Sequence, residues 1–366
     1  MKAIILAGGF ATRLRPLTLT KPKPLLPILD RPLLDWILDS LARAGIKDAI
    51  LSVRYLSNII KEQYEKRNDL NLNLYYAEEP WPLGDAGPIR FIYERFGLDE
   101  TFLVIYGDIF TDINLKQVVD YHKERGSLAT LVLAKVEDPS RYGVVILDEN
   151  YKIVQFIEKP PRGRAPSNLV NAGIYIFEPE VLKYIPDKYP SKLARDVIPK
   201  LVRDKVVYGY KHDGLWSDIG VPEDYLRANI CALQMFHPNG FIASNSEIPE
   251  NVDIINPVFI GSNVKIGVES IIGPNTILCN NIRVGNYTRI ENSIVFSNTI
   301  IEDAAVVQGS IIGEGCHISK WVRIETDSVM GDSTIVDENI YIARKTIVLP
   351  FKEINESIFK EGQVIL

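Results

Sequence analysis

Short apolar runs alternate with amphipathic, helix-like stretches from the N-terminus to about residue 236. Strands are expected at residues 2–7, 49–53, 72–77 and 102–106, and helices at 33–44, 57–66 and 87–95. This alternation indicates βαβ units and a mostly parallel sheet. Right-handed crossovers between such strands give a doubly wound α/β domain, which binds its ligands at the carboxyl ends of the strands.

Further short apolar runs follow at residues 128–134, 144–147, 153–157 and 174–177. They predict hairpin strands laid against the same sheet, so the sheet is expected to be mixed rather than purely parallel. Residues 222–235 have a helical pattern and would close this part of the chain. The pattern therefore predicts a first domain over residues 1–236 and a linker over 237–250.

A period of six replaces these patterns in the last third of the chain. Aliphatic residues recur at Ile254, Ile260, Ile266, Ile272, Leu278, Val284 and Ile290, and after a slip of four at Ile294, Ile300, Val306, Ile312, Ile318 and Ile324. Glycine often follows the aliphatic residue. This hexapeptide repeat is typical of a left-handed parallel β-helix, because a strand-and-turn rhythm does not hold a period of six over such a length.

The β-helix domain is expected to span residues 251–366, with a corner of altered length at the slip and residues 350–366 as a cap. A solenoid has open ends and repeated faces, which commonly support assembly. We therefore expect a homo-oligomer, a dimer or a tetramer, formed through the β-helix.

Composition narrows the functional class. The chain has 366 residues, a formal net charge of −6 and no basic tract, so it lacks the electrostatic footprint of a nucleic-acid-binding protein. Its three cysteines and four histidines are scattered, which argues against disulfides and zinc. No apolar run reaches transmembrane length, and the one at residues 3–7 is too short for a signal peptide. The expected location is the reducing cytoplasm, away from membranes.

The first chemical motif directly follows the first expected strand. It reads Leu6-Ala7-Gly8-Gly9-Phe10-Ala11-Thr12-Arg13-Leu14-Arg15-Pro16. Adjacent glycines let the backbone approach a nucleotide and direct N–H groups at phosphate oxygens, and Arg13 adds a charged fork. The motif is neither GxxxxGK[ST] nor GxGxxG, which excludes the P-loop and dinucleotide interpretations. A second motif, Lys21-Pro22-Lys23-Pro24, holds Lys23 as a point charge on a stiff segment; on its own it would equally fit a solvated lysine.

Together these motifs resemble the sugar-nucleotide pyrophosphorylases, and within them the mannose-1-phosphate guanylyltransferases. The family signature is GGxGTRLxP followed by a PKP lysine; Ala11 stands here in place of the third glycine. An alanine disfavours positive φ, so the loop is expected to sit slightly differently over the triphosphate. The resemblance runs nearly end to end and implies a Rossmann-like catalytic domain followed by a left-handed β-helix. It assigns nucleotide binding to Leu6, Ala7, Gly8, Gly9, Thr12 and Arg13, and catalysis to Arg13 and Lys23.

Two later segments resemble the rest of the family's nucleotide site. Leu83-Gly84-Asp85-Ala86-Gly87-Pro88 is similar to the LGTAGP segment that packs on the base and ribose, with Asp85 in place of threonine. Tyr106-Gly107-Asp108 ends an expected strand. The resemblance implies that Gly84, Asp85 and Gly107 contact the nucleotide and that Asp108 binds the metal.

Three more segments resemble the sugar-phosphate side. They are Phe156-Ile157-Glu158-Lys159-Pro160, similar to FxEKP; Asn171-Ala172-Gly173-Ile174-Tyr175; and Trp216-Ser217-Asp218-Ile219-Gly220, similar to WxDIG. The resemblance assigns the sugar phosphate to Glu158, Lys159, Asn171 and Gly173, and a second metal ligand to Asp218. Taken singly, Asp108 fits a turn and Asp218 a helix cap equally well.

The chemistry agrees with these residue types. Mg²⁺ prefers a few carboxylates together with phosphate oxygens, which suits Asp108 and Asp218. Lys159 would offset the repulsion between two anionic substrates, while Arg13 and Lys23 would stabilise the leaving pyrophosphate. The expected reaction joins a nucleoside triphosphate to a sugar 1-phosphate by direct in-line attack, with no covalent enzyme intermediate.

The base and the sugar are less strongly specified. Glu78 and Glu79 precede Pro80; one carboxylate can accept from both N1–H and N2–H of guanine, whereas uracil and thymine offer only N3–H between two acceptors. An acidic loop explains the pair equally well. Near the C-terminus, Val322-Arg323-Ile324-Glu325 and Ile347-Val348-Leu349-Pro350 resemble scaffold segments of the guanylyltransferase β-helix. GTP with mannose 1-phosphate is favoured, with Glu78 placed on the nucleotide; the alternative is UTP or dTTP with glucose 1-phosphate.

Two other classes remain open. The β-helix could be an acyltransferase, with its only histidine, His317, as the base, although no second catalytic group lies near it in the sequence. The chain could also be a non-catalytic regulatory paralogue. Such a paralogue would be expected to have lost the active-site residues that this chain retains.

Overall fold

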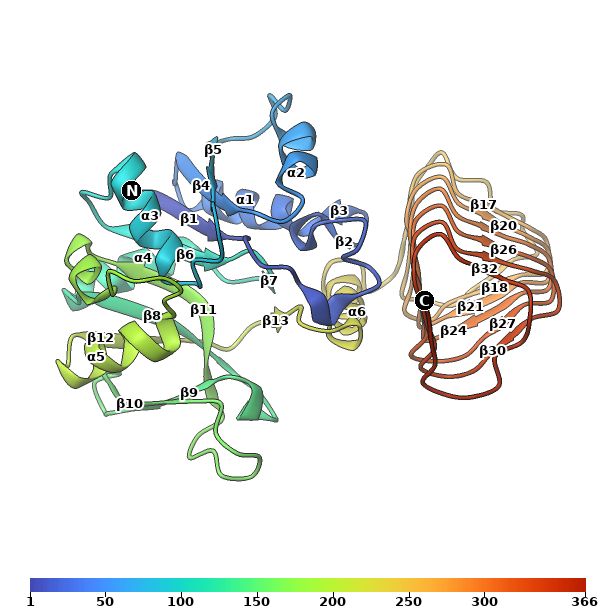
Figure 1. The fold of residues 1–366 in the computed structure, drawn as a ribbon. Coiled ribbons are helices and arrows are strands. Elements are labelled where there is room, and N and C mark those ends of the chain that lie inside the picture. Colours follow the sequence, from blue (N-terminus) through green and yellow to red (C-terminus); the bar gives the residue numbers. More distant parts are fainter. The chain divides into compact units, whose positions relative to one another are not determined.

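The computed structural model describes all residues, 1–366, and divides into two compact units. The first unit comprises residues 1–10 and 33–218. The second comprises residues 11–32 and 219–366. Figure 1 colours the chain from blue at the N-terminus to red at the C-terminus, so the residues of each unit can be traced. No helix is long and apolar enough to cross a membrane.

A nine-stranded mixed sheet forms the centre of the first unit. Its main path runs β10-β9-β11-β6-β1-β4-β5, and β8 joins β11 to β12. The strands β1 (Lys2–Leu6), β4 (Asp48–Val53), β5 (Asn73–Glu78) and β6 (Phe102–Tyr106) are parallel. The antiparallel additions are β8 (Ala129–Lys135), β9 (Gly143–Leu147), β10 (Ile153–Glu158) and β11 (Leu169–Phe177); β12 (Val207–His212) lies parallel to β8. The expected doubly wound mixed sheet is confirmed.

The helices of this unit connect and cover these strands. They are α1 (Leu33–Arg43), α2 (Ser57–Tyr64), α3 (Gly87–Phe96), α4 (Leu115–Arg125) and α5 (Ile198–Arg203). Local signals fix α4: the Asn114 side chain accepts from the amides of Lys116 and Gln117, and Gly126 ends the helix in the left-handed conformation. Strand β6 and residues 129–134 of β8 are buried almost throughout because both faces of the sheet are covered there.

A separate two-stranded ribbon belongs to the same unit. Strand β7 (Ile109–Thr111) pairs antiparallel with β13 (Trp216–Asp218). These strands are far apart in the sequence, and their pairing returns the chain to the residues that follow β6.

The second unit begins with residues 11–32. Two short 3-10 helices, η1 (Thr12–Leu14) and η2 (Lys23–Leu25), lead into the two-residue strands β2 (Pro27–Ile28) and β3 (Arg31–Pro32). This segment packs on α6 (Pro222–Phe236). The buried Asn229 of α6 accepts the Leu29 N–H at 2.8 Å, and the Tyr225 hydroxyl donates to the carbonyl of Pro27.

The remainder of this unit is the expected left-handed β-helix. Its short strands, most of two residues, stack into three parallel sheets. The first sheet contains, in order, β14 (Phe241–Ile242), β16 (Val258–Ile260), β19 (Thr276–Leu278), β22 (Ile294–Val295), β25 (Ile311–Ile312), β28 (Val329–Met330), β31 (Ile347–Val348) and β33 (Val364–Ile365). The second contains β15 (Asp253–Ile254), β18 (Ile271–Ile272), β21 (Arg289–Glu291), β24 (Val306–Gln308), β27 (Arg323–Ile324) and β30 (Tyr341–Ile342). The third contains β17 (Lys265–Ile266), β20 (Arg283–Val284), β23 (Ile300–Ile301), β26 (His317–Ile318), β29 (Ile335–Val336) and β32 (Glu353–Ile354). Asparagines such as Asn263, Asn281 and Asn298 turn one corner at positive φ, which asparagine tolerates better than most residues.

The register after Ile290 differs from the expected one. Ile290 stacks on Val307, and Val284 on Ile301, so each coil is one residue shorter here than where Ile272 stacks on Ile290. The inward series therefore continues through Val295, Ile301 and Val307 before it returns to Ile312, Ile318 and Ile324. The predicted four-residue slip to Ile294 is wrong: two corners each lack one residue. The aliphatic pairs at 294–295, 300–301 and 306–307 hid this, because either member fits the pattern.

This register makes opposite predictions for two adjacent isoleucines. Ile301 is 1% exposed and Ile300 is 37% exposed. Ile301→Ala should lower the free energy of unfolding of the β-helix by about 2–5 kcal/mol, because it opens a cavity in the stack. Ile300→Ala should change it by less than about 1 kcal/mol. Calorimetric unfolding of both variants checks this, and a larger loss in Ile300→Ala would contradict the register.

Candidate active site

The carboxyl ends of three neighbouring strands meet beside the glycine motif. Strand β1 lies between β4 and β6, so the chain leaves it toward one side of the sheet and later returns on the other. This is the switch point at which doubly wound sheets bind ligands. The Ala7 N–H donates to Ser52 O at 2.9 Å, and the Gly107 N–H donates to Leu6 O at 2.9 Å. These bonds bring the Gly8-Gly9 loop and the Gly107-Asp108 turn to one edge.

Close packing explains two of the glycines. A Cβ on Gly8 would lie 2.2 Å from Oε1 of Glu79, and one on Gly107 would lie 3.1 Å from the Ala7 Cβ. A Cβ on Gly9 would meet nothing within 4 Å, and Gly9 is exposed. Gly8 and Gly107 are therefore small because of what lies behind them, whereas Gly9 leaves the outer side of the loop open.

The two glutamates have different surroundings. Glu79 is buried, and its carboxylate accepts from the Ser52 hydroxyl at 2.7 Å. Burial raises the pKa of Glu79 above its ordinary value. Glu78 is exposed and pairs with Lys61 at 2.5 Å, which lowers the pKa of Glu78. The sequence-based assignment placed Glu78 on the nucleotide, whereas the carboxylate beside Gly8 is that of Glu79. Side-chain alternation along β5 is the signal that separates them, because Ala77 points inward and Glu78 outward.

A chain of hydrogen bonds links two motifs through a pair of tyrosines. Asp85 accepts the Leu193 N–H at 2.5 Å and the Tyr106 hydroxyl at 3.2 Å. The Tyr175 hydroxyl lies 3.5 Å from that of Tyr106 and accepts from the Asn171 amide at 2.7 Å. Burial raises the pKa of Asp85 and of both tyrosines, so the phenols remain protonated donors. Both oxygens of Asp85 are used within the protein, and this residue supports the wall of the site.

Gly173 lies against this network. Its φ is +73°, and a Cβ there would lie 2.5 Å from the Tyr106 ring and 2.7 Å from Ile109. Its N–H donates to the Asn171 side chain at 3.2 Å. The indole N–H of Trp216 donates to the Ala172 carbonyl at 2.9 Å, which ties the β13 motif to the same turn. The sequence motifs at 106–108, 171–175 and 216–218 therefore converge. The roles of Tyr106 and Trp216 in this wall were not predicted, although both residues belong to recognised motifs.

The Glu158-Lys159 pair ends strand β10. Lys159 has a positive φ of 47°, and its N–H donates to the Tyr142 carbonyl at 3.0 Å. Its ammonium lies 3.9 Å from the Glu158 carboxylate and is 65% exposed. Partial burial raises the pKa of Glu158. The backbone of Lys159 is thus held by a hydrogen bond in a rare conformation, while its side chain is exposed. This arrangement suits a cation that must reach a ligand.

The two predicted metal aspartates are neighbours through the β7–β13 ribbon. Asp218 pairs with Ile109, the residue that directly follows Asp108. No group of three or more histidine, cysteine, aspartate or glutamate side chains could hold an ion anywhere in the chain. Two carboxylates with no nitrogen or sulfur donor fit Mg²⁺, which takes its other ligands from water and substrate phosphates. They do not fit a closed structural zinc site.

Thr12, Arg13 and Lys23 belong to the second unit. Thr12 and Arg13 lie exposed on η1, and Lys23 begins η2. Ala11 precedes η1 in the left-handed conformation, with φ 46° and ψ 40°. The departure from glycine at this position has therefore not removed the positive φ; the alanine adopts it at a cost of about 1–2 kcal/mol.

His317 is the candidate base of the acyltransferase alternative. Its Nε2 lies 2.8 Å from the Glu302 carboxylate. This partner comes from the preceding coil and was not visible in the sequence. The pair joins two neighbouring coils of the β-helix.

Two glycines with the same φ separate backbone strain from the packing of the site. Gly173 and Gly163 both have φ +73°, but nothing lies within 4 Å of a Cβ on Gly163. Gly173→Ala should displace Tyr106 and lower kcat/KM by about tenfold or more, since small misplacements in a site are costly. Gly163→Ala should carry only the backbone strain and leave turnover near normal. Steady-state kinetics check this, and equal losses in both variants would contradict a packing role for Gly173.

Comparison with known proteins agrees with this geometry. Residues 2–234 match the family model described as nucleotidyl transferase, and residues 254–365 match that described as GMPPB C-terminal domain. A Schizosaccharomyces pombe protein named mannose-1-phosphate guanyltransferase is 36% identical over 100% of both chains. A Sulfolobus acidocaldarius protein that bears the same name provisionally is 44% identical over 69% of each chain.

Among solved structures, a Bacillus anthracis protein provisionally named glucose-1-phosphate thymidylyltransferase superposes with a TM-score of 0.58 at 26% identity. The match covers 63% of this chain and 95% of that one. The chain therefore belongs to the nucleotidyl transferase family, on its mannose-1-phosphate guanyltransferase branch.

Proposed function

We propose that the protein transfers the guanylyl group of GTP to mannose 1-phosphate, giving GDP-mannose and pyrophosphate. The observation that carries this proposal is similarity to a mannose-1-phosphate guanyltransferase over the whole chain, the β-helix included. The structural neighbour named as a thymidylyltransferase matches less of the chain at lower identity. The retained motif residues also favour an active enzyme over a regulatory paralogue.

The reaction is a direct displacement at the α-phosphorus. A phosphate oxygen of the sugar phosphate forms a bond to that phosphorus, the bond to the β-phosphate oxygen breaks, and pyrophosphate leaves with the electron pair. Lys159, open at the end of β10, would hold the sugar phosphate and offset its charge. Arg13 and Lys23 would bind the β- and γ-phosphates and stabilise the leaving group.

Asp108 and Asp218 would hold Mg²⁺, and the ion would supply charge neutralisation and orientation of the phosphates. The neighbouring network of Asp85, Tyr106 and Tyr175 fixes the turn that precedes Asp108. Asn171 and Glu158 would supply hydrogen bonds to sugar hydroxyls. We further propose that the reaction takes place in the cytoplasm. The enzyme would be a homo-oligomer, assembled through the β-helix.

The substrate pair is tested by measuring pyrophosphate release across GTP, ATP, UTP, dTTP and CTP, each with mannose, glucose, galactose and N-acetylglucosamine 1-phosphates. The highest kcat/KM is expected for GTP with mannose 1-phosphate. A maximum at UTP or dTTP with glucose 1-phosphate would keep the mechanism and reject the guanine assignment. No release from any pair would reject the enzyme.

Two adjacent carboxylates allow a matched test of base recognition. Glu79 faces the Gly8 loop and has spare acceptor capacity, whereas Glu78 is paired with Lys61 at the surface. Glu79→Gln should lower the preference for GTP over UTP by about tenfold or more, because an amide cannot accept from both guanine donors. Glu78→Gln should leave the ratio unchanged. If only Glu78→Gln lowered the preference for GTP, Glu78 would be the residue that recognises the base. If neither variant changed the preference, other residues would recognise the base.

The metal assignment predicts a dependence on Mg²⁺ as well as a loss of rate. Asp108→Asn and Asp218→Asn should each lower kcat by about 10²–10³-fold and raise the Mg²⁺ concentration needed for half-maximal rate. Asp120→Asn, on the exposed face of α4, is the control; its carboxylate pairs only with Lys116. Titration of Mg²⁺ against pyrophosphate release measures both effects. Normal turnover at an unchanged Mg²⁺ requirement would remove the residue from the metal site.

A further inference from the structure

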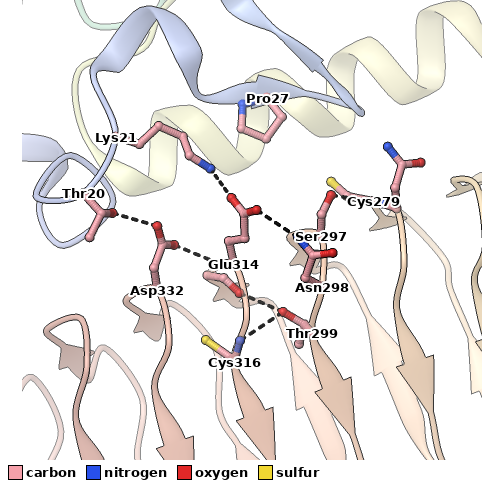
Figure 2. Close-up of polar contacts among 12 residues, drawn as sticks. Thr20, Lys21, Pro27, Cys279, Ser297, Asn298, Thr299, Glu314, Cys316 and Asp332 are labelled. Atoms are coloured by element: carbon pink, nitrogen blue, oxygen red, sulfur yellow. Dashed lines mark hydrogen bonds and ion pairs between the residues drawn. The ribbon is translucent and has the colours of Figure 1, made fainter. Parts of the chain in front are cut away.

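The segment of residues 11–32, which carries Arg13 and Lys23, is fastened to the β-helix by two carboxylates. The Lys21 ammonium lies 2.6 Å from Oε2 of Glu314, and the Thr20 hydroxyl donates to Oδ2 of Asp332 at 2.7 Å. Figure 2 shows both side chains of the segment directed at these acceptors. Glu314 and Asp332 are eighteen residues apart and lie on successive coils. The charge that neutralises Lys21 therefore comes from the scaffold and not from the nucleotide motifs.

Each acceptor is held in place by a second bond. The backbone N–H of Glu314 donates to Oδ1 of Asp332 at 2.8 Å, which ties the Asp332 carboxylate to the backbone of the preceding coil. The other oxygen of Glu314 accepts from the Asn298 amide at 3.0 Å. Asn298 is the last member of a ladder along one corner, in which each side-chain amide donates to the next at 2.9–3.1 Å: Asn245, Asn263, Asn281 and Asn298. Glu314 is thus the end of a continuous row of hydrogen bonds.

Further contacts hold the segment at Lys21 and at Leu29. The Lys21 ammonium lies 5.6 Å from the centre of the Phe296 ring. The Cys279 thiol donates to the Leu29 carbonyl at 3.2 Å, and burial raises the pKa of Cys279, which keeps the proton on sulfur. With the Leu29 N–H bonded to Asn229, both backbone groups of Leu29 are satisfied. The segment is therefore fixed at residues 20–21 and again at residue 29.

A stiff proline joins the two lysines of one motif. Pro22 is extended, with φ −65° and ψ 144°, and its ring fixes φ, so the backbone from Lys21 to Lys23 has little freedom. Glu314 takes Lys21. Lys23 begins the 3-10 helix η2, whose N–H groups at Leu25 and Leu26 are bonded to Pro22 and Lys23 carbonyls. The scaffold contact at Lys21 therefore lies only two residues from Lys23, on the same stiff stretch of backbone.

We propose that Glu314 and Asp332 of the β-helix are positioning residues for nucleotidyl transfer. They hold Thr20 and Lys21 so that Arg13 and Lys23, which lie on the same segment, are presented to the triphosphate in fixed positions. This role rests on the proposed function. It gives the β-helix a role in positioning Arg13 and Lys23, which belong to the same unit.

Kinetics of four variants test the role. Glu314→Gln and Lys21→Met should each raise KM for GTP and lower kcat/KM by about 5–20-fold, since a small displacement of charged groups in a site is costly. The exchange Lys21→Glu with Glu314→Lys should recover activity relative to either charge reversal alone, as coupling in a double-mutant cycle requires. Glu302→Gln breaks a comparable ion pair, that with His317, and should leave kcat/KM unchanged.

A purely structural role predicts a different pattern. In that case Glu314→Gln would lower the unfolding midpoint but leave KM and kcat per folded molecule as in the parent, and the exchange would recover stability alone. That result would overturn the proposal. Asp332→Asn repeats the test through Thr20 without changing the Lys21 pair, so a poorly folding Glu314 variant does not decide the outcome.

Amide hydrogen exchange tests the fastening without any turnover. In Glu314→Gln, exchange should become faster at Leu17, Leu19, Leu25 and Leu26, whose N–H groups bond within the segment. Glu302→Gln should leave these amides as protected as in the parent. Unchanged protection in Glu314→Gln would overturn the proposal even if no substrate pair were turned over, whereas loss of turnover in the parent protein would reject the proposed function alone.

Discussion

Repulsion between two phosphate-bearing substrates is the constraint on which this structure depends. A triphosphate and a sugar phosphate approach each other only if cations surround them, and the net charge of the chain is −6. Attraction by the protein as a whole is therefore not available. The positive groups must be few and accurately placed, which requires that their backbone be held by bonds to rigid neighbours.

The first unit meets this constraint at the ends of its strands. Parallel pairing brings Ala7 to Ser52 and Gly107 to Leu6, and the β7–β13 ribbon returns Asp218 to the residue after Asp108. A carboxylate pair made in this way is separated by more than a hundred residues in the sequence, yet its backbone is fixed by sheet hydrogen bonds. The network of Asp85, Tyr106, Tyr175 and Asn171 then holds the turn at Gly107-Asp108. Its members hydrogen-bond one another, so none of their side chains is left without a partner.

Long-range repetition is the strongest structural signal in the sequence. It does not decide between two adjacent residues that fit the repeat equally well. The period of six predicted the β-helix, and alternation of strands and helices predicted the doubly wound sheet. The register beyond Ile290 could not be predicted, because paired aliphatic residues at 300–301 fit two phases and only burial distinguishes them. Motifs predict which residues belong to the site, but they do not predict the partners of Asp85, since the Leu193 amide and the Tyr106 hydroxyl reach it from other elements.

The segment at residues 11–32 shows why sequence position alone misjudges structural membership. It lies inside the catalytic part of the sequence, yet it packs with α6 and the β-helix. A solenoid satisfies its backbone bonds coil by coil, so it resists local deformation and suits the task of holding a flexible stretch. The left-handed Ala11 at the start of the segment needs such support, because strain of this kind persists only where surrounding contacts over-determine the conformation. The Ala11 carbonyl accepts from the Leu14 N–H at 3.0 Å and from the Thr18 hydroxyl at 2.9 Å, and these bonds provide such contacts within the same unit.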